Sequence, residues 1–137
     1  HNSHVLPAFI RKVHDAKKSG AKSITVWGSG TPRREFLHTA DLAEACLFLL
    51  ENYDQPDLVN IGCGEDVTIR ELAETVCDVL GFDGTLEVDT SKPDGTPRKL
   101  LDISKIKSLG WSPKISLRDG IAHAYRWFCE NYKEARL

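Results

Sequence analysis

Two pairs of adjacent basic residues follow turns of the same build. Arg33-Arg34 comes after Gly-Ser-Gly-Thr-Pro, and Arg98-Lys99 comes after Asp-Gly-Thr-Pro within the stretch KPDGTPRK, residues 92–99. A guanidinium fork matches the oxygens of a phosphate, and a Gly/Pro turn holds it with less entropy to lose on binding. A single pair would be interpreted as solvated loop charge. Two pairs of the same build leave that interpretation and a pyrophosphate clamp equally open.

Two further side chains could take part in binding or catalysis. His4 lies beside polar Asn2 and Ser3 at the expected entrance of a helix, where an imidazole can exchange protons near neutral pH. Trp27 ends an expected strand directly before a glycine turn, where its ring could stack on a base or a sugar. An ordinary surface histidine and a core tryptophan are the alternatives. Neither residue identifies a reaction by itself.

Several familiar catalytic motifs are absent. No G-x-G-x-x-G follows a strand, because Gly28 and Gly30 stand in a different frame and Gly62-Cys63-Gly64 lacks the third glycine. The sequence also has no G-x-S-x-G, no H-E-x-x-H and no P-loop lysine motif. These glycines are therefore interpreted as turns, and hydrolase, zinc protease and NTPase functions have no support.

The elements that would position these residues alternate between helix and strand, which predicts an α/β fold. The strands are too few and too scattered to form a doubly wound sheet alone. Expected N-caps are Ser3, Thr39, Thr68 and Ser116, with Thr68 and Glu71 forming a capping box. The patterns predict helices over residues 5–18, 40–53, 69–80, 103–109 and 117–132, and strands over residues 23–27, 35–38, 58–62 and 85–89.

The cysteines are too far apart to suggest zinc or a redox dithiol. Three of the four fall in helical apolar patterns, where cysteine acts as a small buried hydrophobe, so we expect reduced, structural thiols and a cytoplasmic location. One such pattern is the apolar stripe of the second helix. The cysteines are Cys46, Cys63, Cys77 and Cys129, and the stripe is Leu42, Ala45, Cys46, Leu49 and Leu50.

Length and charge limit the remaining functions. The chain has 137 residues, enough for one domain with a sizeable core, and a formal net charge of -2, which argues against nucleic-acid binding. No apolar run reaches the roughly 20 residues of a membrane span, and nothing indicates a signal peptide. Because the chain contains no methionine and opens at a helix entrance, we expect a piece of a longer protein.

In their order along the chain, four stretches resemble the C-terminal half of GDP-L-fucose synthase, an extended short-chain dehydrogenase/reductase. They are SHVLPAFIRKVHDAKKSG, VWGSGTPRREFLHTADLAEA, NIGCGEDVTIRELAE and SKPDGTPRKLLDISKIKSLGW. The resemblance covers nearly the whole chain. The glycine turn with its following helix is general to extended short-chain reductases, whereas NSHVLPA, the Trp of VWGSGTPRR and KPDGTPRK are particular to the fucose synthases.

The resemblance implies a single C-terminal substrate-binding domain, residues 1–137, of α/β type with helices and short strands, lacking the N-terminal Rossmann half. The whole enzyme would convert GDP-4-keto-6-deoxy-D-mannose to GDP-L-fucose, by epimerisation at C3 and C5 and reduction of the ketone by NADPH. The fragment alone is expected to be inactive.

Residue roles follow from the same resemblance. His4 falls on the family's acid/base histidine, which also lies near the cofactor, and its partner cysteine would be in the missing half. Substrate contacts fall on Lys12, where an Arg can stand, and on Trp27, Arg34, Asp94 and Lys99. KPDGTPRK would therefore hold a GDP-sugar.

The parts needed for hydride transfer are missing from this sequence. It has no dinucleotide loop and no Tyr-x-x-x-Lys. The nearest spacing to the latter runs from Tyr132 to Arg136, and so ends in an arginine. NADP(H) is thus expected to bind mainly to the missing N-terminal half, and the family implies a homodimer. Two alternatives remain: another nucleotide-sugar epimerase or reductase of the superfamily, and a nucleotide-sugar binding module without catalysis.

Overall fold

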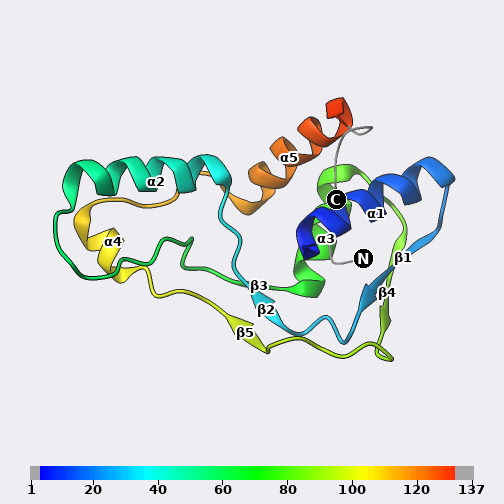
Figure 1. Cartoon of the computed structure of the whole chain (residues 1–137). Coiled ribbons are helices and arrows are strands. Elements are labelled where there is room, and N and C mark those ends of the chain that lie inside the picture. The colour runs from blue at the N-terminus through cyan, green and yellow to red at the C-terminus, as the bar shows by residue number, and fades with distance from the viewer. Residues whose placement is uncertain (1–3, 132–137) are drawn as a thin grey trace.

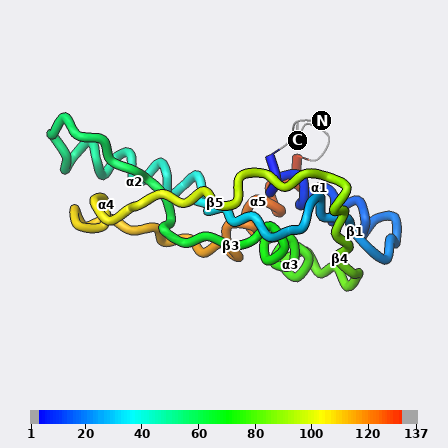
Figure 2. Tube along the Cα trace, turned by 90° about the horizontal axis from the view of Figure 1, so that it is seen from below, coloured from blue at the N-terminus to red at the C-terminus, as the bar shows by residue number. Residues whose placement is uncertain are grey.

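The molecule is elongated, with a group of helices at each end; one set of short strands lies between them and a second set lies at one end (Figures 1 and 2). A computed structural model describes residues 4–131. Within that range the elements are, in chain order, α1 (Val5–Ser19), β1 (Ser23–Trp27), β2 (Arg33–Arg34), α2 (Thr39–Asn52), β3 (Val67–Thr68), α3 (Ile69–Leu80), β4 (Thr85–Asp89), β5 (Arg98–Lys99), α4 (Ser104–Leu109) and α5 (Leu117–Asn131).

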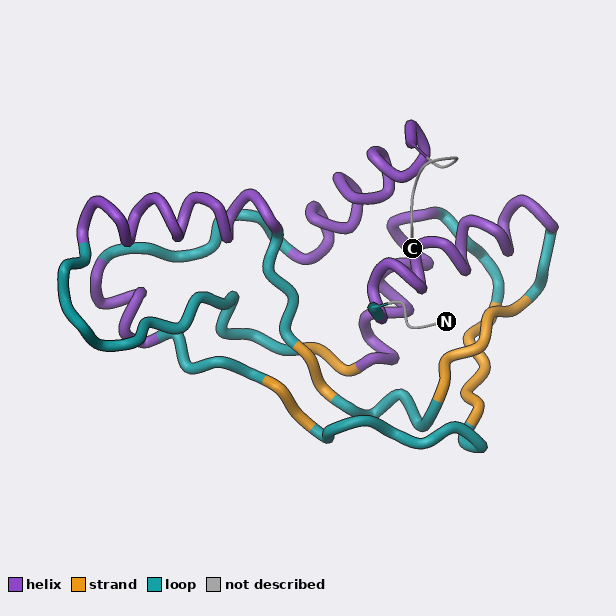
Figure 3. The backbone as a smooth tube through the Cα atoms, viewed as in Figure 1, coloured by secondary structure: helices purple, strands orange, loops and turns teal. Residues whose placement is uncertain are grey.

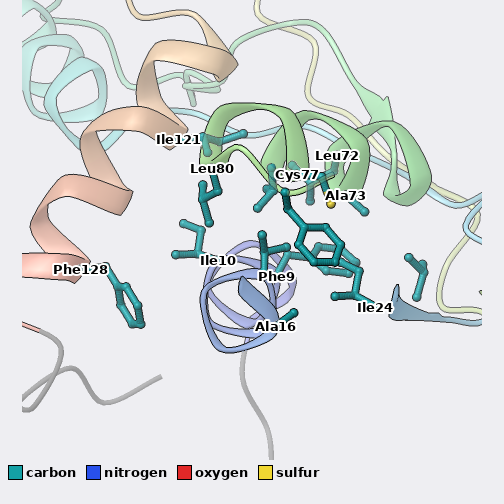
Figure 4. Close-up of a cluster of buried hydrophobic side chains, with 14 residues drawn as sticks. Phe9, Ile10, Ala16, Ile24, Leu72, Ala73, Cys77, Leu80, Ile121 and Phe128 are labelled. Carbon is teal, nitrogen blue, oxygen red and sulfur yellow. The ribbon is translucent and has the colours of Figure 1, made fainter. Parts of the chain in front are cut away.

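The main core lies where α1, α3 and α5 meet β1 and β4. Helix α1 buries Phe9, Ile10, Val13 and Ala16, which recur at helical spacing and so share one face. Figure 4 shows Phe9 and Ile10 turned toward the buried face of α3. The cluster is completed by Ile24 and Val26 of β1, by Leu72, Ala73, Val76, Cys77 and Leu80 of α3, by Phe82, and by Ile121 and Phe128 of α5.

Helix α3 begins and ends where the sequence predicts. The Thr68 hydroxyl accepts a hydrogen bond from the Glu71 amide at 3.0 Å, and the Glu71 carboxylate accepts one from the Thr68 amide at 2.7 Å. These reciprocal bonds satisfy two amides that a helix start would otherwise leave open. Gly81 ends the helix with a φ of 63°, a left-handed conformation that glycine adopts without strain.

Two small sheets connect the helices, and Figure 3 shows their strands along one side of the molecule. In the described range, β1 and β4 form a parallel pair with Ser23 opposite Thr85. The second sheet has the order β3-β2-β5, with β3 antiparallel and β5 parallel to β2. The basic pairs predicted from the sequence therefore form neighbouring strands of one sheet.

A second core lies at the opposite end of the molecule, under α2 and α4. It consists of Ala45, Ile103, Ile106 and Trp111, with Phe48, Leu49, Val59 and Ile61 packed against it. Asp41, in the first turn of α2, is only 2% exposed and accepts hydrogen bonds from the amides of Lys114 and Ile115. A buried carboxylate thus holds α2 to the segment that leads into α5.

Two predicted strands are wrong. Residues 35–38 form no strand, because the pairing with β3 and β5 uses Arg33 and Arg34 instead. Residues 58–62 also form no strand; Val59 and Ile61 bury their side chains in the second core, so the apolar pattern reflects burial without a sheet partner.

The cap and stripe of α2 also differ from prediction. The cap is His38, whose Nδ1 accepts the Ala40 amide at 3.1 Å, and not Thr39. The helix buries the face of Asp41 and Ala45, so the predicted stripe is split and Leu42, Cys46 and Leu50 are exposed. The sequence cannot distinguish the two faces because both are apolar. Ser116 does accept the Asp119 amide as the predicted cap of α5. Ser3, the predicted cap of the first helix, lies outside the described residues, and the N-cap residue of α1 is His4 instead.

The cysteines all lie in the described range and are free thiols, as predicted, but most are not buried. Cys77 belongs to the main core, Cys63 is half-buried, and Cys46 and Cys129 are exposed. Cysteine acts as a buried hydrophobe here only on α3. Within residues 4–131, no helix has the length and apolar character needed to cross a membrane.

The capping box predicts how stability depends on pH. Hydrogen bonds from the Thr68 amide and hydroxyl lower the pKa of Glu71 below its ordinary value of 4.5. The charged form therefore stabilises the folded state fully above pH 4.5, and this contribution is lost as the pH falls through the lower folded pKa. In urea unfolding between pH 2.5 and 7, the destabilisation by Glu71→Gln should be complete at pH 6 and shrink below pH 4.5.

The control is Glu74→Gln, which removes the same charge from the same helix. Glu74 pairs with Arg70 at 3.1 Å and lies beyond the first turn, so its replacement should cost less at pH 6. A Glu71→Gln effect that stays constant with pH would contradict the charged capping box.

Candidate functional site

Five of the six residues singled out in the sequence belong to one connected surface. Lys12 comes from α1, Trp27 from the end of β1, Arg34 from β2, Asp94 from the loop after β4, and Lys99 from β5. We call this surface the cationic site.

Trp27 is a surface residue and not the core tryptophan that the sequence left open. Its exposed fraction is 64%. The ammonium groups of Lys12 and Lys92 lie 5.7 and 5.8 Å from the centre of the indole ring. These are cation–π distances, so the exposed indole is flanked by two positive charges.

The Lys12 ammonium is held in place by a backbone carbonyl and an aromatic ring. It donates a hydrogen bond to the carbonyl of Thr25 at 2.6 Å and lies 5.9 Å from the Phe9 ring. Burial lowers the pKa of Lys12, because a partly desolvated ammonium favours loss of its charge. An anion bound beside Lys12 would offset that cost.

Asp94 joins the loop of residues 90–97 to the turn that follows β1. Its carboxylate accepts hydrogen bonds from the Ser29 amide at 2.8 Å and from the Ser29 hydroxyl at 2.7 Å. The carboxylate lies directly over Gly28, whose φ is +79° and where a Cβ would be 2.3 Å from Asp94 Oδ1. Only glycine allows this close approach at a left-handed position.

Asp66 binds the first residue of each basic pair and not the second. Its carboxylate accepts a hydrogen bond from Arg33 Nε at 2.8 Å and another from Arg98 Nε, while its carbonyl accepts Arg33 Nη2 at 2.9 Å. The hydrogen bonds from Arg33 and Arg98 lower the pKa of Asp66. One cation of each pair therefore already has a carboxylate partner, and the two share it.

Arg34 and Lys99 are the remaining members, and they are register partners in the parallel β2–β5 pair. Among the described residues, neither has a carboxylate within ion-pair distance. Arg34 Nη1 donates to the Arg33 carbonyl at 2.7 Å, and Arg34 Nη2 lies 3.2 Å from where a Cβ on Gly95 would be. Of the four cations that the sequence offered for a pyrophosphate clamp, two remain available on these strands.

His4 lies apart from the cationic site. It is the exposed N-cap residue of α1, its carbonyl accepts the Ala8 amide at 3.0 Å, and its side chain makes no cap hydrogen bond. Lys12 follows eight residues later, about 12 Å along the helix axis. An acid/base group at His4 would thus act about 12 Å from the position of Lys12 along the helix.

Sequence reasoning missed Asp66 and Glu35, and it gave Lys92 no individual role. Asp66 gave no signal, because only the strand register brings it between two arginines. Lys92 belongs to the stretch KPDGTPRK, but its position beside Trp27 could not be predicted from the sequence. Glu35 accepts hydrogen bonds from the amides of Cys63, Gly64 and Leu101, and so joins three loops.

Two cavities lie near these elements, and one of them borders the cationic site. A cavity of about 420 Å³ borders Arg34 and is also lined by Phe36, Val67, Lys107 and Lys114. A larger one of about 580 Å³ lies between α1, the segment of residues 36–39 and α5, and its lining is mainly apolar. The smaller cavity, which has the more polar lining of the two, borders the cationic site at Arg34. Within residues 4–131, no cluster of side chains could hold a metal ion.

Comparison with known proteins gives consistent relatives. The NAD dependent epimerase/dehydratase family matches residues 1–62. GDP-L-fucose synthase 1 of Arabidopsis thaliana is 60% identical over 130 residues, which is 95% of this chain and 40% of that protein. GDP-L-fucose synthase of Escherichia coli is 49% identical over 144 residues, 98% of this chain and 45% of that protein.

A solved structure has the same fold. The GDP-L-fucose synthetase of Naegleria fowleri bound to NADP superposes with a TM-score of 0.89 at 32% identity, over 98% of this chain and 43% of that one. The chain thus spans about two fifths of the length of its relatives.

The contact between Gly28 and Asp94 can be tested with two alanine variants. Gly28→Ala should break the Ser29–Asp94 bonds and release the loop of residues 90–97, because the new Cβ would collide with Asp94. Gly20→Ala is the control: its φ is +67°, but nothing lies within 4 Å of its Cβ position. Both variants carry a backbone strain of about 1 kcal/mol.

Hydrogen exchange of the Ser29 amide separates the two effects. It should speed up in Gly28→Ala and stay near wild type in Gly20→Ala. Equal exchange in the two variants would mean that Asp94 does not brace the turn.

Proposed function

This chain is a relative of the GDP-L-fucose synthases with the fold of the C-terminal part of an extended short-chain reductase, and we propose that it binds the GDP-sugar of such an enzyme. The proposed reaction converts GDP-4-keto-6-deoxy-D-mannose to GDP-L-fucose, with epimerisation at C3 and C5 and reduction at C4 by NADPH. The remaining machinery would belong to the part of its relatives that this chain does not span.

One observation carries the proposal. Arg34 and Lys99 stand side by side in the β2–β5 register, without carboxylate partners in the described range, while Arg33 and Arg98 share Asp66. Two adjacent free cations fit the two negative charges of a pyrophosphate, and a guanidinium can bind two of its oxygens at once.

The rest of the cationic site fits the other parts of a nucleotide-sugar. Trp27 offers an exposed ring on which a base or a sugar could stack. Lys12 would add a charge beside it, and Asp94 could accept hydrogen bonds from hydroxyl or amino groups of the ligand while it braces the turn. These roles agree with the positions that the family resemblance assigns.

His4 is proposed as the acid/base group. The 4-keto group of the substrate acidifies the protons at C3 and C5, so that a histidine near neutral pH can remove and return them. The exposed imidazole makes no cap hydrogen bond, which leaves its nitrogens available. None of the four cysteines here matches the partner cysteine of the family.

NADP(H) fits the described residues poorly, apart from the proposed contact at His4. A dinucleotide loop needs a strand, a glycine turn and then a helix whose free amides receive the phosphates. The turn after β1 leads into strand β2 instead, and its Ser29 amide is occupied by Asp94. We therefore propose that the cofactor, which supplies the hydride, binds mainly outside this chain.

Two further proposals concern the whole enzyme. The first is that the whole enzyme assembles as a homodimer, which the family resemblance supports. A cytoplasmic location is supported by four cysteines without a disulfide.

Binding by the chain itself tests the site. Calorimetric titration should give tighter binding of GDP-mannose than of GMP, since the second phosphate adds a charge for Arg34 and Lys99. Arg34→Ala should weaken GDP-mannose binding roughly tenfold to a hundredfold, the range for a charged hydrogen bond. Arg126→Ala is the control, because Arg126 is exposed on α5. Equal losses in both variants would remove Arg34 from the site.

The role of His4 requires a full-length enzyme that contains this chain. His4→Asn should slow exchange of the C3 and C5 protons with deuterated solvent by about a hundredfold or more, while substrate affinity changes little. His123→Asn, an exposed histidine of α5, should leave exchange unchanged. Normal exchange in His4→Asn would assign the acid/base step to another group.

A further inference from the structure

The β2–β5 pair carries an unusual concentration of positive charge. Arg33 lies opposite Arg98, and Arg34 opposite Lys99, so every residue of this two-residue ladder is a cation facing another cation. Like charges directly opposite one another destabilise a sheet. A ladder this short has few backbone hydrogen bonds to set against that repulsion, one of them from the Arg33 amide to the Pro97 carbonyl at 2.7 Å.

Asp66 is the carboxylate that pairs with these cations. It precedes β3, on the other side of β2 from β5, and its side chain is only 4% exposed. One oxygen accepts from Arg33 and the other from Arg98, so a single carboxylate spans the two strands. Glu71 adds a weaker contact, 3.9 Å from Arg33.

The arrangement also divides the four cations into two that are paired with Asp66 and two that are not. Because Asp66 binds the first residue of each basic pair, the second residues, Arg34 and Lys99, keep their charges for a ligand. Without Asp66 the four cations would repel one another, and β5 would be free to move away from β2. The loop of residues 92–97 leads directly into β5 and would move with it.

We propose that Asp66 is a positioning residue of the cationic site: it pairs with both Arg33 and Arg98 and thereby holds Arg34 and Lys99 in register for the diphosphate. This role rests on the proposed function for the identity of the ligand, but the charge arrangement that it describes exists without one.

The test compares Asp66→Asn, Arg98→Gln and the double variant. Asp66→Asn keeps the size of the side chain and removes its charge. It should speed hydrogen exchange of the Arg33 amide and weaken GDP-mannose binding roughly fivefold, the upper range for opposed like charges in a sheet. Arg98→Gln should remain near wild type, because Arg33 keeps its partner. The double variant should recover both exchange and affinity to within about twofold, since removing Arg98 ends the repulsion between Arg33 and Arg98 that Asp66 otherwise offsets.

Three internal checks distinguish this mechanism from a general loss of structure. The Gly28 amide, bonded to the Asp89 carbonyl at 2.9 Å, should exchange alike in all variants, because it reports the β1–β4 pair. High salt should restore protection of the Arg33 amide in Asp66→Asn, as screening weakens the repulsion. Asp66→Glu should retain part of the binding.

Two results would overturn the proposal: unchanged Arg33 exchange in Asp66→Asn, or a double variant as impaired as Asp66→Asn. Failure of the proposed function gives a different result. In that case wild type would not bind GDP-mannose at all, while exchange of the Arg33 amide would still show whether Asp66 holds the two strands together.

Discussion

The placement of one carboxylate between two guanidiniums is the constraint on which the cationic site depends. Asp66 accepts hydrogen bonds from Arg33 and Arg98, on neighbouring parallel strands, in a setting where its side chain is nearly inaccessible to water. A buried carboxylate is tolerated only when its charge is paired. The same pairing allows the strands to carry two more cations, Arg34 and Lys99, next to each other. The ion pairs of Asp66 therefore both join the two strands and reduce the repulsion between them.

Other carboxylates serve the fold in a similar way. Glu35 accepts amides from the loops at residues 63–64 and 101, Asp41 accepts amides from residues 114 and 115, and Asp94 accepts the Ser29 amide. Strands of two residues make few ladder hydrogen bonds, so much of the irregular backbone needs side-chain acceptors. Each carboxylate lies where segments distant in sequence meet. Together they hold loops in place around the site without long sheets.

The two hydrophobic cores support different parts of the molecule. The core of α1, α3 and α5 supports β1, and with it Lys12 and Trp27. The core under α2 and α4 lies at the far end (Figure 1), where Leu42, Leu47 and Leu50 remain exposed on α2. The small sheet with Arg34 and Lys99 lies between the two ends (Figure 1). The cationic site thus combines a side supported by the first core with strands that Asp66 holds together.

Local patterns in the sequence were sufficient for the helices, for the capping box at Thr68 and Glu71, and for strands 23–27 and 85–89, because caps, glycine stops and apolar spacing act over a few neighbouring residues. The basic pairs and Trp27 also stood out by residue type alone. The tertiary structure decided which cations stay free, which face of α2 is buried, and that residues 58–62 pack as a loop. The first outcome depends on Asp66 reaching Arg98, 32 positions away, and on a strand register that no local pattern encodes. The other two depend on packing in the second core, between segments distant in sequence.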